Sequence, residues 1–118
     1  MSKITDDFFE SVSLSYKEAF EIMMRSTSDS IYFKDCQSRF LFVSNAQLRR
    51  LNKKDMQDVI GKSDFDFFSK EHAEKAIQEE QEIIRTGVPI INEEEHSAFA
   101  NGELLWAKVS RYPLYDHK

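Results

Sequence analysis

Cysteine is almost absent from this chain of 118 residues, since Cys36 is the only one. A single thiol cannot form a disulfide within the chain, and disulfides persist mainly in oxidising compartments. We therefore expect the protein to work in a reducing compartment, the cytoplasm.

Long apolar runs are absent as well. A membrane-spanning helix needs roughly 20 predominantly apolar residues, and a signal peptide needs a shorter apolar core near the N-terminus. Because the sequence contains neither, it predicts no direct membrane insertion by this chain, although the chain could form part of a longer, membrane-bound protein.

Concentrated positive charge is the third absence. The chain has 16 basic and 21 acidic residues, a formal charge of -5, and its basic residues cluster only within residues 49–54. Since affinity for phosphates depends on clustered positive charge, the sequence disfavours nucleic-acid binding. The acidic run at residues 93–95 is interpreted as a solvated strand edge rather than a metal site.

Residues of the kinds that perform catalysis or bind metals form no recognisable motif. His72, His96 and His117 do not have the spacing of zinc ligands, so no metal site is predicted. Asp64 and Asp66 lie two residues apart, which points two side chains of one helix in different directions. Capping and helix-dipole roles therefore fit them better than a general acid and base, and we expect no enzymatic activity.

Phenylalanine is the residue that the chain uses in excess, with ten copies beside four Tyr and one Trp. A chain of this length fits one domain that can bury a substantial core. We expect aromatic side chains to dominate that core.

Residues 1–26 carry apolar side chains at the spacing of one helical stripe. Ser15 lies three residues before Glu18, the spacing of a capping box, so a second helix could start there after a break. The stripe could pack on the sheet of its own domain or form a dimer seam. Its members are Phe9, Val12, Tyr16, Phe20 and Met23.

Two short runs rich in aromatic and β-branched residues, "DSIYFKD" and "RFLFVSN", predict a hairpin joined by the polar turn "CQS". Both faces of this hairpin are apolar, so we expect the N-terminal helix to cover the outer one. Asn45 is expected to cap the short helix that follows.

The segment "GKSDFDFF", residues 61–68, is expected to form a helix start, with Ser63 and Asp66 at capping spacing and Phe65 and Phe68 facing inward. Residues 70–86 then form the longest predicted helix, closed by Gly87 and Pro89.

A second hairpin is predicted to turn at Asn101-Gly102, a dipeptide suited to the twist of paired strands. The order of elements predicts an α+β fold with an antiparallel sheet and helices gathered on one face.

Several segments resemble the PAS domain family, the sensory box modules of bacterial signalling proteins. The resemblance covers about residues 25–118 and rests on "IYFKD" with "RFLFVSNAQ", "VIGKSDFDFF", "IIRTGVPI" and "NGELLWAKVSRYPLYD", in that order. It implies a PAS core at 27–118, and we expect the helical segment at 1–26 to serve dimerisation or signal relay. The family adds a final strand after a motif like Pro113–Asp116, and we expect this chain to lack that strand.

The resemblance also implies a pocket between sheet and helices that holds haem, flavin or a small metabolite in related domains. The haem-binding branch uses a His inside the long helix, where this chain has none beyond His72 at its start. The flavin-bonding branch uses a Cys on a central helix, whereas Cys36 lies in the first hairpin turn. The sequence therefore disfavours haem and covalent flavin and leaves non-covalent flavin open.

The same resemblance gives candidate pocket residues, for which ordinary core packing is the alternative interpretation. The ring nitrogen of Trp106 would need a polar partner if buried. Arg85 could meet an anionic ligand or form a surface salt bridge with a nearby Glu. The candidates are Leu41, Phe65, Phe68, Ile77, Ile84, Arg85 and Trp106.

The function implied by the resemblance is sensory: a ligand or partner shifts the conformation of a homodimer, and a C-terminal output domain responds. That output domain would be a histidine kinase of a two-component system or a diguanylate cyclase, outside this chain. The alternative is a ligand-free dimerisation module. A small enzyme that uses Asp66 as a base is a third, weaker hypothesis.

Overall fold

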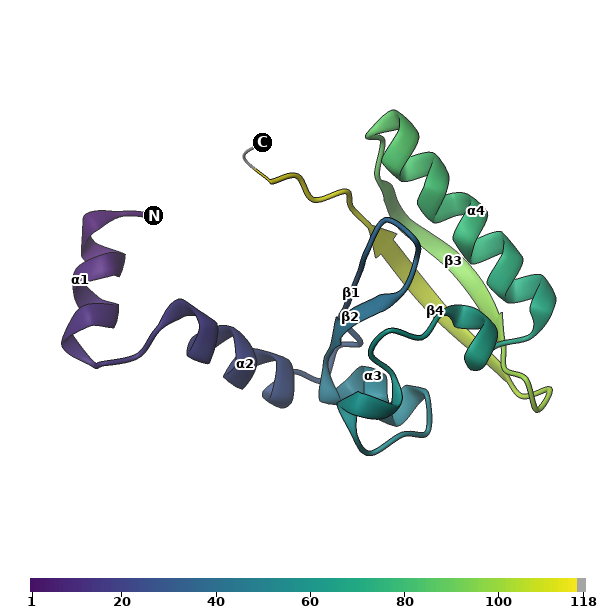
Figure 1. Cartoon of the computed structure of the whole chain (residues 1–118), viewed down its shortest axis with the longest axis horizontal. Helices are drawn as coiled ribbons and strands as arrows, with labels where there is room; N and C mark the ends of the chain where they lie inside the picture. Colours follow the sequence, from purple (N-terminus) through teal and green to yellow (C-terminus); the bar gives the residue numbers. More distant parts are fainter. Residues whose placement is uncertain (117–118) are drawn as a thin grey trace. The chain divides into compact units, whose positions relative to one another are not determined.

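The computed structural model describes residues 1–116, so His117 lies outside the described part. The chain is α+β, as predicted (Figure 1). Its elements are α1 (Lys3–Ser11), α2 (Tyr16–Ser26), β1 (Tyr32–Lys34), β2 (Phe40–Val43), α3 (Asn45–Arg50), η1 (Met56–Asp58), η2 (Asp64–Asp66), α4 (Lys70–Thr86), β3 (Ile90–Ala98) and β4 (Leu104–Arg111).

The strands described in residues 1–116 form two separate two-stranded sheets, β1 with β2 and β3 with β4. The chain also divides into two compact units that interleave in sequence. The first unit comprises residues 1–32 and 42–58, and the second comprises residues 33–41 and the chain from residue 59 onward. The first hairpin contributes residues to both units, and the division into a helical segment at 1–26 and a PAS core at 27–118 stays a prediction.

The first unit begins with two helices rather than one. The chain leaves helical geometry after Val12, with Ser13 at a left-handed φ of 53°, and α2 starts where the Ser15 hydroxyl accepts from the Glu18 amide at 3.0 Å. The alternative of a second helix capped at Ser15 is therefore confirmed. The Phe20 ring of α2 packs on Phe42 of β2, with 5.1 Å between centroids, and both residues belong to the first unit.

Helix α3 is capped by Ser44, not by Asn45. The Ser44 hydroxyl accepts from the Gln47 amide at 3.2 Å, and Asn45 is already the first helical residue. The prediction was wrong by one position because Ser and Asn are both good N-caps and stand side by side. The core of this unit consists of Met24, Val43, Ala46, Leu48 and Leu51.

In the second unit, α4 runs along one face of the β3–β4 hairpin (Figure 1). Ser69 caps this helix through the His72 amide at 3.2 Å, and Gly87 ends it at a left-handed φ of 73°. The turn at Asn101-Gly102 joins β3 to β4 in an antiparallel register that opposes His96 to Trp106. The extent of α4, its end at Gly87 and the turn at Asn101-Gly102 agree with the sequence predictions. No helix within residues 1–116 has the length and apolarity needed to cross a membrane.

Candidate functional site

The second unit contains a group of buried charged side chains, which we call the charge network. At one end, the Lys34 ammonium donates to Asp64 Oδ2 at 2.7 Å and to Glu80 Oε2 at 2.6 Å. These three side chains are only 9%, 5% and 11% exposed. The ammonium also lies 4.7 Å from the centroid of the Phe40 ring, which favours a cation at that position. The members are Lys34, Asp64, His72, Glu79, Glu80, Glu95 and Arg111.

Arg111 holds the other end of the charge network. Its guanidinium binds Glu79 Oε2 at 2.9 Å and Glu95 Oε2 at 3.1 Å. Its Nε lies 3.9 Å from the same Glu80 oxygen that binds the lysine, so Glu80 connects the two ends. His72 Nε2 lies 3.4 Å from Glu95 Oε1 and extends the network toward the start of α4.

Regular secondary structure explains how these residues come together. His72, Glu79 and Glu80 lie seven and eight residues apart, which places them on one face of α4. Glu95 is on the face of β3 that includes buried Ser97, because alternate residues of a strand share a face. Arg111 ends β4 and Lys34 ends β1.

Within the charge network, the pKa values of Lys34 and Glu80 are both raised above their ordinary values. Burial alone would lower the pKa of Lys34, but the charges of Asp64 and Glu80 outweigh it and raise that pKa. For Glu80 the outcome is reversed: burial raises its pKa, the Asp64 charge adds to the rise, and Lys34 opposes both without cancelling them. The lysine therefore stays charged while Glu80 is an unusually weak acid, because one ammonium cannot fully neutralise two buried carboxylates.

Aromatic rings lie next to the charged groups. The Phe68 ring contacts the His72 imidazole with 4.5 Å between centroids and stacks on Phe99 at 5.1 Å. Phe40, whose ring lies near the lysine, contacts Phe67 edge-on at 6.0 Å. The network is thus bordered by apolar rings, which keep it away from water and strengthen its electrostatic interactions.

The seven candidate pocket residues all belong to the second unit, but their exposures differ widely. Phe68 is buried and Ile77 is half-buried. Arg85 forms the surface ion pair with Glu82 that was the alternative to ligand binding. Leu41, Phe65, Ile84 and Trp106 are 53%, 49%, 45% and 66% exposed. The Trp106 ring lies against His96 across the strand pair. That these seven residues line a pocket remains a prediction.

The inward orientation predicted for Phe65 is wrong. Asp64–Asp66 is a single 3-10 turn that does not continue as a helix, so residues 65 and 68 do not share a face; Phe67 and Phe68 are buried instead. Asp66 does cap, accepting from the Ser63 amide at 3.0 Å. Asp64 has a different role from the predicted one, because it is buried and ion-paired with Lys34.

Residues 93–95 are not uniformly a solvated edge either. The run alternates across β3, so Glu94 is exposed while Glu95 is 7% exposed and bound to Arg111. The strand period of two would have separated Glu94 from Glu95, but the partner on β4 could be found only from the register. The lysine partners lie 30 and 46 residues away in sequence, and no local pattern signals them.

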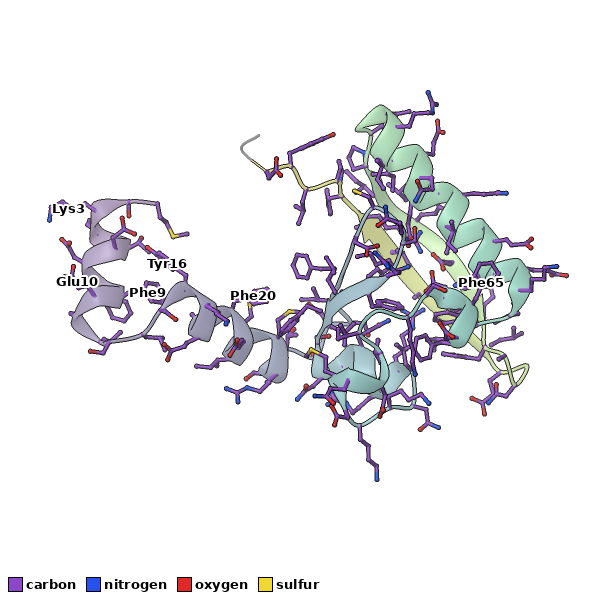
Figure 2. The ribbon with its side chains drawn as sticks, viewed as in Figure 1. Lys3, Phe9, Glu10, Tyr16, Phe20 and Phe65 are labelled. Carbon is purple, nitrogen blue, oxygen red and sulfur yellow. The ribbon has the colours of Figure 1, made fainter. Side chains whose placement is uncertain are left out.

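The predicted dimer residues lie on α1 and α2, except for Val12 just after α1, and part of their apolar surface is uncovered. Phe9 and Tyr16 point toward each other across the bend between the helices, with 4.8 Å between ring centroids (Figure 2). Val12, Tyr16 and Met23 are 47%, 45% and 52% exposed, whereas Phe9 and Phe20 are half-buried.

A comparison with protein families matches residues 24–118 to the family described as the PAS fold. The chain belongs to the PAS fold family. The match begins within α2 and extends over both units, so the PAS assignment made from the sequence motifs is confirmed. None of the curated proteins matches this PAS domain.

Solved structures similar to this PAS domain include two of VqmA. A structure of VqmA bound to DPO has a TM-score of 0.71 and 19% identity, covering 84% of this chain and 50% of that one. A Vibrio cholerae VqmA dimer without target DNA has a TM-score of 0.72 and 19% identity, with 88% and 47% covered. This chain therefore spans about half the length of VqmA.

A third similar structure is the PAS domain of an HTR-like protein from Haloarcula marismortui. Its TM-score is 0.56 at 18% identity, and the alignment covers 92% of this chain and 84% of the other. At such identities, similarity to solved structures shows a shared fold and does not transfer a ligand or partner.

Proposed function

We propose that this PAS domain is a non-catalytic sensory module of a cytoplasmic signalling protein. A small ligand or a protein partner would bind one of its conformations more tightly and shift the population toward it. The observation that carries the proposal is the PAS family match over residues 24–118, because the known role of this family is sensing. A differential affinity of about 1–3 kcal/mol between two conformations is enough for a useful signal.

The proposed ligand site is in the second unit, on the candidate pocket residues. Phe68 is the strongest member because it is buried and contacts the charge network through His72, and the half-buried Ile77 is the next. A site that combines apolar rings with a few fixed polar groups suits a small ligand of mixed polarity. The proposal disfavours haem and covalent flavin, for the reasons of residue position given by the sequence, so the purified protein should show no haem absorption band and no flavin that stays attached after denaturation.

The output domain is proposed to lie outside this chain. A histidine kinase or a diguanylate cyclase follows from the family resemblance, and the similarity to VqmA adds a DNA-binding receptor as a third class. In that third class the nucleic acid would be bound by a separate domain, since this chain has a formal charge of -5 and little clustered positive charge.

A ligand screen tests the sensory proposal. Thermal-shift measurements against a library of small metabolites, with native mass spectrometry of the hits, should reveal a compound that raises Tm and adds a discrete mass. Phe68→Leu should raise the ligand concentration needed for the same Tm shift at least tenfold. Lys70→Gln, on the exposed side of α4, should leave that concentration unchanged. A complete screen without a hit would oppose ligand sensing and favour the second candidate.

The second candidate is a ligand-free dimerisation module. The apolar side chains left exposed on α1 and α2 favour it, because a water-exposed stripe on adjacent helices is typical of a surface that a partner covers. Homodimerisation through this surface is compatible with both candidates, so it identifies the module only when ligand binding is absent.

A further inference from the structure

The charge network contains more negative than permanent positive charge. Its four carboxylates face Lys34 and Arg111, and Glu79 also pairs with the exposed Lys75 at 3.8 Å, which leaves an excess of one negative charge when His72 is neutral. Burying uncompensated charge is costly, and a protein commonly avoids the cost by binding a proton. The arrangement therefore favours proton uptake by one of the four carboxylates.

Asp64 and Glu80 are compensated less well than Glu79 and Glu95, because they share one close cation, Lys34. Glu79 is 21% exposed and has its own contact with Arg111, while Glu95 has Arg111 and His72. Glu80 shares its lysine with Asp64, and the Nε of Arg111 stays 3.9 Å away.

The second carboxylate oxygen of Glu80 gives an independent reason to expect proton uptake by this residue. Glu80 Oε1 is buried and accepts no hydrogen bond of sound geometry from residues 1–116, although the nearby Ser38 hydroxyl partly favours the charged form. A buried carboxylate oxygen without a donor gains more from protonation than one that is hydrogen-bonded.

The charged or titratable groups that face Glu80 come from three other elements. They are Lys34 of β1, Asp64 of η2 and Arg111 of β4, with Glu79 as its neighbour on α4; Glu95 of β3 acts on it through Arg111. Since Glu80 joins β1 to α4 and lies next to the end of β4, its charge affects how these three elements hold together.

We propose that Glu80 binds a proton as the pH falls from neutral, and that this proton makes the packing of α4 against β1 and β4 dependent on pH. The proton is the ligand, and the charge network is its site. This inference is separate from the proposed function, because it requires neither a small-molecule ligand nor a dimer.

The test compares thermal unfolding of the wild type, Glu80→Gln and Glu74→Gln. Gln copies the shape of the protonated acid, so Glu80→Gln is expected to have its greatest advantage in Tm over the wild type near neutral pH. That advantage should shrink as the pH falls, by roughly 3–6 °C per pH unit within the titration range. Glu74 lies on the exposed side of the same helix with its side chain 51% exposed, so Glu74→Gln should follow the wild type at every pH.

Parallel Tm curves for the wild type and Glu80→Gln would overturn the proposal. If Glu80→Gln does not fold, the side-chain carboxyl carbon of Glu80 can be titrated by NMR in the wild type. A midpoint clearly above the ordinary glutamate value of about 4.3 supports the proposal, and a midpoint at or below that value contradicts it.

Discussion

Lys34 is the residue on which the charge network depends most. Lys34→Met removes the ammonium that Asp64 and Glu80 share and leaves two carboxylates buried without it. Breaking a buried ion pair from one side costs about 3–5 kcal/mol. We therefore expect Lys34→Met to lower the free energy of unfolding by that amount, measured by urea denaturation at neutral pH.

Lys70 provides the matched control at an exposed position. It also pairs with a glutamate, Glu74, but its side chain is 81% exposed, so Lys70→Met should cost no more than about 1 kcal/mol. An equal decrease in the free energy of unfolding for the two variants would show that burial of the charge network does not contribute to stability.

The Lys34→Met loss also has an expected pH dependence. The pKa of Lys34 is raised in the folded protein, so its contribution is fully present below the ordinary lysine value of about 10.4 and is lost only at higher pH. On the acid side the loss should shrink as the pH falls, since the pKa of Glu80 is raised and its protonated form no longer needs a cation. Urea denaturation of both proteins across this range measures both limits.

Single residues of this site illustrate what a local pattern can reveal. The capping role of Asp66 follows from its spacing to Ser63, and the structure confirms it. Asp64 has the same residue type and the same neighbourhood in sequence, yet it pairs with a lysine 30 residues earlier. Spacing predicts contacts within one turn, whereas this ion pair depends on how distant segments fold together.

At the scale of single elements, the N-cap residues differ in how many hydrogen bonds their side chains form. The buried Ser44 hydroxyl accepts from the amides of Gln47 and Ile31 and donates to the Asp29 carbonyl. Ser44→Ala leaves buried backbone groups without a partner, so we expect a loss of about 2 kcal/mol. Ser15→Ala removes an exposed cap of α2 and should cost about 0.5–1 kcal/mol.

Thermal or urea unfolding monitored by circular dichroism measures both cap variants. If Ser44→Ala costs no more than Ser15→Ala, the link from α3 to residues 29–31 contributes nothing to stability. Helix α4 illustrates the predictable side of this scale: Ser69 starts it and Gly87 ends it, as their residue types indicate.

At the scale of the whole molecule, the exposed apolar surface of α1 and α2 predicts self-association. Met23→Glu places a charge on this surface without disturbing the buried Met24 beside it. We expect Met23→Glu to shift the protein from dimer to monomer in sedimentation velocity, with an increase of at least tenfold in the dimer Kd.

Lys17→Gln is the control, because it changes the net charge by the same amount at an exposed polar position of α2. It should leave the dimer intact. A wild-type protein that is monomeric at high concentration, or a Met23→Glu variant that dimerises normally, would contradict dimerisation through these helices.

The sequence by itself determined the class of fold, the family, the two hairpins and the limits of the long helix. These features depend on periodicity, caps and turn residues, which act over a few neighbouring positions. It also predicted an inward-facing Phe68, which is buried.

Only the tertiary structure decided which charges are buried and which aromatic rings face water. Glu95 was expected to be solvated and Phe65 to face inward, and the structure reverses both. The physical reason is that the cost of burying a charge depends on its partners, and Lys34, Glu80 and Arg111 meet only when β1, α4 and β4 are brought together.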